Sequence, residues 1–371
     1  MEHPWGVGHL PSLDGWRALC ILLVLGSHAK NTANFPPQWD VLLGWLFDGN
    51  LGVRCFFIIS GFLITTLMLR ETASRGSLDL KGFYLRRAVR ILPVYLAFLV
   101  AVALLEYFTA FDQPASQWGH LLTFTTNFSL SGNWLTGHTW SLACEEQFYL
   151  IWPVVFAAVG LQFVRKSLWL LGLPLVLCPL WRVVSYLKVF PDNGFFSGFS
   201  IFNYLDTLAF GCLLAYAHPW IGQRLNTGRT SIPRVLGSGL ILILGPYALQ
   251  HALVLGIITV PFAHTFQALG LCLLISLSIH QPSQGPSRVL NLKPVIWLGQ
   301  LSYSIYIWQQ FFFTPPAVFG WQLMWFQSTQ FWILAALGTG IASYYLLERP
   351  LLEFRIRLRQ RVLEPAKTGQ L

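Results

Sequence analysis

The chain has 371 residues, of which 54% are hydrophobic and only 11% are charged. So few charges cannot cover the surface of a water-soluble domain, in which about a quarter of the residues are charged, whereas a surface that faces lipid needs none. The composition therefore excludes a soluble enzyme and indicates a membrane protein with several spans. The 16 Trp and 12 Tyr fit aromatic belts at its two interfaces.

The apolar stretches predict an all-α membrane protein, because each helix needs ~20 residues to cross the hydrocarbon and the runs lack the two-residue alternation of barrel strands. Ten spans are expected, at roughly 13–30, 51–69, 87–108, 139–161, 168–187, 203–219, 234–250, 255–279, 292–313 and 330–347. A single transmembrane domain is predicted over residues 1–355. A basic cytoplasmic tail is predicted at 356–371, and the connection at 109–138 is expected to be only a loop.

Lys and Arg accumulate in alternate connections, most of all in the 70–90 connection and in the tail. This asymmetry predicts a multi-pass protein of the cytoplasmic membrane with both termini in the cytoplasm. The net charge of +9 is then mostly a topology signal and indicates no nucleic-acid partner. The six cysteines all lie in or at the ends of apolar spans without metal-ligand spacing, so neither a disulfide framework nor a metal is expected.

The first span, LDGWRALCILLVLGSHA at 13–29, carries three ionisable side chains. Arg17 and His28 are eleven residues apart, which at ~100° per residue places them on one face of a helix, ~16 Å apart along its axis. Asp14 lies on much the same face, one turn before Arg17. A polar stripe of this kind must face protein or water. The alternative is an interfacial ion pair between Asp14 and Arg17, with His28 in the water of the outer headgroups.

The third span begins with FYLRRAVRILP at 83–93, where Arg86, Arg87 and Arg90 converge at spacings of three and four residues. Guanidinium groups grip phosphates with two hydrogen bonds each. The sequence therefore predicts a phosphate-binding patch at the cytoplasmic start of this span. An anchor that only sets the membrane topology explains the same residues.

The fourth span enters with GHTWSLACEEQFYLIWP at 137–153. Adjacent carboxylates in such a helix are costly, so one of Glu145 and Glu146 is expected to orient or ionise a histidine and the other to pair with an arginine. Ser141 and Tyr149 lie four residues on either side of Glu145. The alternative is a structural network with Arg54 or Arg182. Three further candidates are more readily explained without a catalytic role, His138 as a solvated residue and the other two as packing residues. The other two are Asp206 and the aromatic run at 301–310.

With these motifs the sequence resembles the acyltransferase-3 family of integral membrane O-acyltransferases, which modify cell-surface polysaccharides, peptidoglycan, lipids and some antibiotics. LDGWRALCILLVLGSH resembles the first-span signature of the family. The later family blocks follow in order as GVRCFFIISGFLIT, FYLRRAVRILPVY, HTWSLACEEQFYLIWP, LDTLAFGCLLA, LGQLSYSIYIW and LERP, so the likeness covers roughly residues 11–355.

The resemblance implies that His28 is the catalytic histidine and Arg17 its motif partner, and Arg17 is expected to help with the cofactor or with orienting the polar stripe. It implies that Arg87 and Arg90, with Arg86 beside them, hold the phosphates of acyl-CoA, and that Glu145 and Glu146 are the acidic pair of the fourth span. One departure is visible: after SYSIYIW the family commonly has histidine, where this chain has Gln309. That substitution puts a proton-transfer role at this position in doubt.

Together these observations predict a membrane acyltransferase that uses cytoplasmic acyl-CoA, expected to be acetyl-CoA, and a hydroxyl of a surface saccharide as acceptor. His28 would act as general base, since the imidazole pKa lies near working pH. A proton-coupled secondary transporter using the same buried charges is the alternative, and a scaffold subunit of a polysaccharide machine is a third reading. Membrane lipids are the other expected partner, and the oligomeric state stays open.

Overall fold

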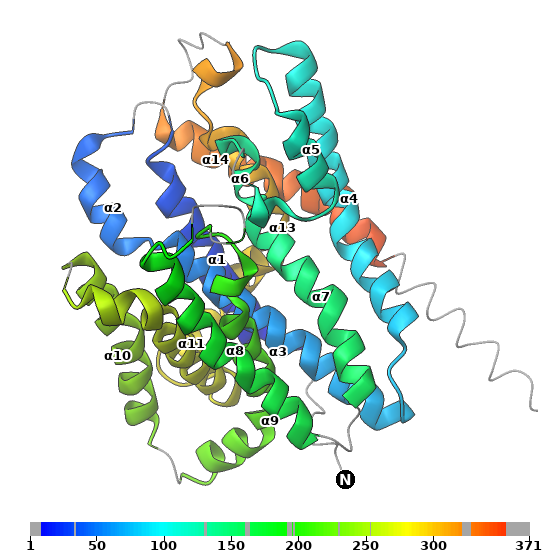
Figure 1. Ribbon diagram of the computed structural model, residues 1–371, viewed down its shortest axis with the longest axis vertical. Helices are drawn as coiled ribbons and strands as arrows, with labels where there is room; N and C mark the ends of the chain where they lie inside the picture. The colour runs from blue at the N-terminus through cyan, green and yellow to red at the C-terminus, as the bar shows by residue number, and fades with distance from the viewer. Residues whose placement is uncertain are drawn as a thin grey trace, which may run out of the picture. The chain divides into compact units, whose positions relative to one another are not determined.

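The structure, a computed structural model, describes residues 9–32, 35–129, 132–159, 164–190, 195, 197–228, 231–252, 254–320 and 328–353 (Figure 1). The tail predicted at 356–371 lies outside these residues. Within them every regular element is helical. The predicted all-α fold class is thus confirmed for the described part of the chain.

In these described ranges, ten long helices coincide with the ten predicted segments. They are α1 (Pro11–Ala29), α3 (Gly49–Arg75), α4 (Leu80–Phe108), α7 (Thr139–Val159), α8 (Val164–Tyr186), α9 (Leu205–Asn226), α10 (Ile232–His251), α11 (Gly256–His280), α13 (Lys293–Phe313) and α14 (Thr329–Ser343), the last continued by the π-helical segment η6 (Tyr344–Glu348). Among the described residues, seven helical segments are long and apolar enough to cross a membrane, and α1, α9 and α13 fall outside that set. Ten spans and two cytoplasmic termini therefore stay predictions.

The connections contain short helical elements that the sequence analysis did not predict. They are η1 (Pro37–Trp39), α2 (Asp40–Leu46), α5 (Ala115–Leu122), η2 (Thr126–Phe128), α6 (Trp134–Gly137), η4 (Ile201–Asn203), α12 (Ser287–Leu290) and η5 (Pro316–Phe319). The connection at 109–138 is thus more than the loop expected, because it holds α5, η2 and α6. With 8, 3 and 4 residues, these three are too short for an apolar period to be visible in the sequence.

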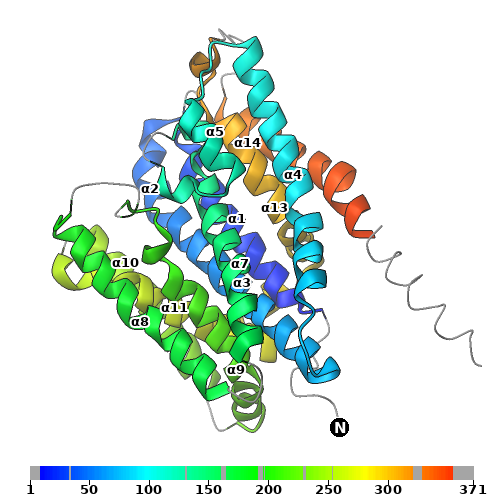
Figure 2. The same cartoon turned by 45° about the vertical axis from the view of Figure 1, so that its right-hand side comes forward.

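The chain divides into two compact units, each built from separate stretches. The first contains Met1–Ser27, Gln38–Leu78 and Pro114–Gln300, and the second contains His28–Pro37, Asp79–Gln113 and Leu301–Leu371. In the first unit α3, α7, α8, α9, α10 and α11 pack side by side, as the two views of Figures 1 and 2 both show. The contiguous domain predicted over 1–355 is not tested by this division.

Glycines allow a close helix crossing in the first unit, between α3 and α9. A Cβ on Gly61 would lie 2.2 Å from the carbonyl oxygen of Leu208, and one on Gly211 would lie 2.1 Å from that of Ile58. In an apolar solvent helices gain little from burying apolar surface, so close backbone approach at small residues is a main source of association. This crossing supports α3, which carries part of the candidate site.

In the second unit α13 is held by α4 on one side and by α14 on another. The hydroxyl of Tyr303 donates to the carbonyl oxygen of Ile91 in α4 over 2.7 Å. Phe98 of α4 makes edge contacts with Trp308 and Phe311, at centroid distances of 6.0 and 5.4 Å. On the other side Gly340 of α14 lies directly against Ile305. These contacts fix the position of α13, whose C-terminal half carries Gln309.

Candidate functional site

Two of the polar residues of α1 contact each other at its start. Asp14 is only 9% exposed, and its carboxylate lies 3.8 Å from the guanidinium of Arg17 and 2.8 Å from Nε2 of His9. The ion pair between Asp14 and Arg17 considered from the sequence is therefore present, and its place at a membrane interface stays a prediction. That Arg17 also helps to bind the cofactor stays a prediction.

His28 lies in the last turn of α1 and finds its partner on α13. Its Nδ1 is 3.0 Å from Oε1 of Gln309, whose side chain is completely buried. Both residues belong to the second unit. The hydrogen bond to a buried amide fixes the orientation of the imidazole ring. A general base must be positioned within hydrogen-bond reach of the proton that it takes, and a fixed ring favours that role.

The three arginines of the predicted phosphate patch occupy the first turns of α4, and all three are half-buried. The helix starts at Asp79, whose carboxylate accepts a hydrogen bond from the backbone N–H of Gly82 over 2.9 Å. The absence of a side chain at Gly82 leaves room for Arg86, because a Cβ there would lie 2.8 Å from its guanidinium. Arg86, Arg87 and Arg90 share the second unit with His28.

The acidic pair of α7 lies in the first unit, and one of its carboxylates has a described partner. The hydroxyl of Ser60 in α3 donates to Oε1 of Glu145. Two turns further along α7, the indole of Trp152 donates to Thr65 of α3 over 3.0 Å. These bonds tie α7 to α3, with Glu145 and Glu146 both half-buried.

The neighbours of the pair are more deeply buried than the pair itself. His138, Ser141 and Tyr149 are each no more than 6% exposed. The hydroxyl of Ser141 donates back to the carbonyl oxygen of His138 over 3.3 Å. His138, which was expected at a solvated mouth, is thus enclosed at the N-terminal end of α7, which is a correction to the expected solvation.

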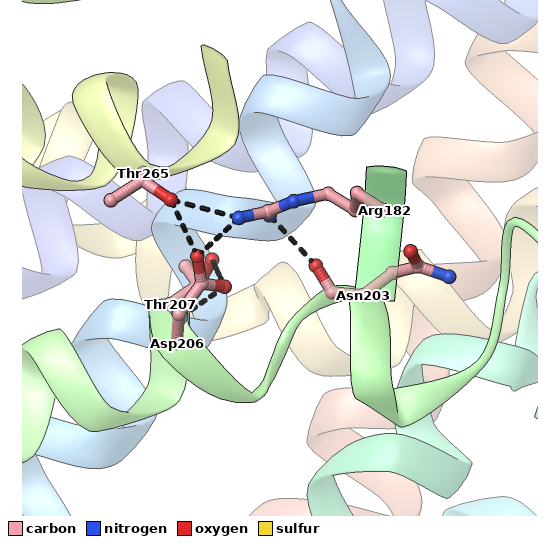
Figure 3. A network of polar contacts seen from close by, with 5 residues as sticks. All are labelled: Arg182, Asn203, Asp206, Thr207 and Thr265. Atoms are coloured by element: carbon pink, nitrogen blue, oxygen red, sulfur yellow. Dashed lines mark hydrogen bonds and ion pairs between the residues drawn. The ribbon is translucent and has the colours of Figure 1, made fainter. Parts of the chain in front are cut away.

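Arg54 and Arg182 pair with aspartates. Arg54 lies 3.2 Å from Asp48, and Arg182 donates to Asp206 over 2.6 Å. Figure 3 shows the second pair with its neighbours: Thr265 bridges the two charged groups at 2.8 Å to each, and Arg182 also donates to the carbonyl oxygen of Asn203 over 3.0 Å. Both charged side chains are at most 4% exposed. In this network the buried guanidinium of Arg182 and the buried carboxylate of Asp206 neutralise each other inside the first unit.

Residues 10–348 match the sequence profile of a family described as an acyltransferase domain, the acyltransferase-3 family. The chain belongs to this family. The match begins one residue before α1 and ends with η6, so it takes in every residue of the candidate site.

Three curated relatives of this acyltransferase domain are bacterial. The chain is 28% identical to the peptidoglycan O-acetyltransferase OatA of Listeria monocytogenes over 81% of this chain and 49% of that protein. It is 29% identical to the putative peptidoglycan O-acetyltransferase YrhL of Bacillus subtilis over 92% of this chain and 55% of that protein. The O-acetyltransferase OatA of Staphylococcus aureus is 28% identical over 83% and 51%.

This chain therefore spans about half the length of the curated relatives it matches. No solved structure matches it. In the part of the chain that the structure describes, no group of three or more His, Cys, Asp and Glu is arranged to hold a metal, and all six cysteines are buried free thiols. That no metal takes part in the reaction stays a prediction.

Sequence reasoning missed the partners of the ionisable residues. Gln309 was singled out only as a departure from the family, and Ser60 and Thr265 were not noticed, because a lone hydroxyl in an apolar helix is a weak signal. Glu348 of the LERP block is only 4% exposed and accepts a hydrogen bond from Ser304 over 2.8 Å. It lies in η6, and π-helical turns are frequent at functional sites.

The Arg182–Asp206 pair gives a direct prediction for stability. Replacing Asp206 with Ala leaves a buried guanidinium without its carboxylate, and such a loss costs about 3–5 kcal/mol. We expect a lower midpoint of thermal unfolding for the purified protein in detergent. The matched control is Arg75→Ala, which breaks the exposed pair with Glu71 and should cost less than about 1 kcal/mol. Equal midpoints for the two variants would contradict the network.

Proposed function

We propose that this chain is a membrane-embedded O-acyltransferase that moves an acetyl group from acetyl-CoA to a hydroxyl of an extracytoplasmic saccharide. One observation carries the proposal: the second unit contains both the oriented imidazole of His28 and the three arginines Arg86, Arg87 and Arg90. Membership of the acyltransferase family supports the reaction class. The proposed location is the cytoplasmic membrane, in line with the helices that are long enough to span it.

The donor end of the proposed reaction uses the start of α4. Coenzyme A carries a diphosphate and a further phosphate, and three half-buried guanidiniums within two turns of one helix match that charge. The hydrogen bond from Tyr303 to Ile91 holds this part of α4 against α13. The thioester end of the donor would then extend away from the arginines toward His28.

At the acceptor end His28 is proposed as the general base. Its imidazole takes the proton of the acceptor hydroxyl as that oxygen attacks the thioester carbonyl carbon. The tetrahedral intermediate collapses with cleavage of the C–S bond, and the CoA thiolate leaves and takes up a proton. The products are an O-acetyl ester and free CoA. Proton transfer by a positioned side chain contributes typically 10²–10⁴-fold to such a step.

The acidic pair is proposed to support the acceptor side. Glu145 accepts a hydrogen bond from the hydroxyl of Ser60, which orients its carboxylate. That one of the glutamates stabilises the imidazolium of His28, and that Arg17 helps with the donor, are expectations from the sequence alone. Further supporting residues are proposed around the acceptor: Arg54, His138, Ser141 and Tyr149.

The nature of the acceptor is inferred from the relatives. Two of those reported above carry names that assign them to peptidoglycan, one of the two as putative, and the third is named only as an O-acetyltransferase. We infer a saccharide of the cell envelope for this chain also. The relatives are about twice as long as this chain, so the acceptor is the part of the proposal that most needs direct measurement.

The proposal is tested with purified protein in liposomes. Acetyl-CoA labelled in the acetyl group is supplied on one side and peptidoglycan fragments or other saccharides on the opposite side. Ester-bound label on the saccharide together with release of free CoA supports the enzyme. Uptake of solute without CoA release would overturn the proposal in favour of the transporter.

The role of His28 is tested by His28→Ala. We expect transfer of acetyl to fall by roughly 10²-fold or more, because the general base is removed, while the protein still inserts and binds CoA. Binding is measured by titration with CoA, and insertion by monodisperse elution in detergent. Full residual transfer would remove His28 from the mechanism.

The arginine patch is tested by replacing Arg87 and Arg90 with Gln. The double variant should raise the Kd for CoA and the KM for acetyl-CoA by about tenfold or more for each guanidinium that binds a phosphate, since charge-assisted hydrogen bonds contribute ~1.5–3 kcal/mol. Turnover at saturating donor should change less. Arg75→Gln removes a nearby exposed positive charge and is the control. An unchanged Kd in the double variant would leave these residues as topology anchors.

A further inference from the structure

The structure assigns a role to Gln309: we propose that it is a positioning residue that holds His28 in the tautomer with the proton on Nδ1, leaving Nε2 as the basic atom. The inference rests on the proposed function of His28. It goes further by naming which nitrogen accepts the proton and which residue decides it.

The contact itself is direct. Oε1 of Gln309 lies 3.0 Å from Nδ1 of His28, within the range of a good N–H···O hydrogen bond. In this orientation the amide oxygen can only accept, so Nδ1 of the imidazole must donate. A neutral imidazole carries one proton, and with that proton on Nδ1 the lone pair lies on Nε2.

The amide oxygen suits both states through which a general base passes. When Nε2 takes a proton, both ring nitrogens become donors, and Oε1 of Gln309 still accepts from Nδ1. An amide turned the other way would present an N–H to Nδ1 and would oppose that protonated state. The arrangement seen in the structure therefore keeps its hydrogen bond throughout the proposed cycle.

The environment of Gln309 resists rotation of the amide. The side chain is fully buried, and its helix is fixed by the contact of Tyr303 with Ile91 and by the packing of Phe98 against α13. Among the described residues the amide nitrogen Nε2 of Gln309 has no hydrogen-bond partner. The amide oxygen Oε1 is bonded to His28. Leaving both polar ends of a buried amide unpaired costs more than leaving one, which favours the bond to His28.

An amide also limits what this position can do. Gln309 has no proton to exchange near neutral pH, so it cannot relay the proton that His28 receives. It also places no formal negative charge beside Nδ1. The consequence is a histidine that is oriented by a neutral group, and its imidazolium must find any counter-charge elsewhere.

The tautomer is measured by ¹⁵N NMR of protein labelled on its histidine side chains, in detergent. The chain has nine histidines, and the His28 signals are those that disappear in His28→Ala. We expect a protonated Nδ1 and an unprotonated Nε2 for His28 in the wild type. This pattern should disappear in Gln309→Met, which keeps the size of the side chain but removes the acceptor. A wild-type His28 with the proton on Nε2 would overturn the proposal.

Kinetics provide the second measurement. Gln309→Met should lower kcat by roughly 10²-fold, the lower bound of what a general base contributes, with little change in KM for acetyl-CoA. Gln309→Glu restores an acceptor for Nδ1 and should recover most of the rate. Gln310→Met is the matched control, since Gln310 is 2% exposed on the same helix and should change stability without changing the tautomer of His28.

The outcomes separate this inference from the proposed function. Gln309→Met with wild-type kcat would overturn the positioning role while leaving the acyltransferase proposal in place. If the wild type transfers no acetyl group at all, the proposed function fails. In that case the NMR measurement still decides whether Gln309 sets the tautomer.

Discussion

A polar side chain inside a bilayer has no water to bond with, so the protein itself must supply its partner. In this chain that constraint is visible at three ionisable groups within long helices. Arg182 bonds Asp206 and Thr265, Glu145 accepts from Ser60, and His28 meets Gln309. Each of these bonds joins two different helices, so the polar residues that the reaction is proposed to use also help to fix which helices are neighbours.

The same constraint organises the proposed chemistry. A histidine facing acyl chains would have no orientation and no proton partner, whereas His28 has an amide that determines the direction of its ring. The arginines of α4 have the opposite requirement in the proposed reaction, in which they must stay accessible enough to bind a phosphate. The second unit meets both needs, because α13 carries the amide in its C-terminal half and bonds α4 through Tyr303.

The sequence predicted the helical class, the positions of the ten long helices in the described ranges and the family, because apolar length and ordered motif blocks are strong local signals. The ion pair of Asp14 with Arg17, which lies within one helical turn, was considered from the sequence as an alternative, and the structure contains it. The sequence did not predict the partners Gln309, Ser60 and Thr265, which are separated from their ionisable residues by 281, 85 and 83 positions. Such contacts depend on helix packing, on which a single sequence carries almost no information.

The central claim is that one protein joins a donor held by the arginines of α4 to the imidazole of His28. An experimentally determined structure of the protein with CoA bound tests it most directly. The account predicts phosphate oxygens within hydrogen-bonding distance of at least two of Arg86, Arg87 and Arg90, with the thiol directed toward His28. CoA bound at another surface, or His28 facing lipid with no passage to the bound thiol, would contradict it.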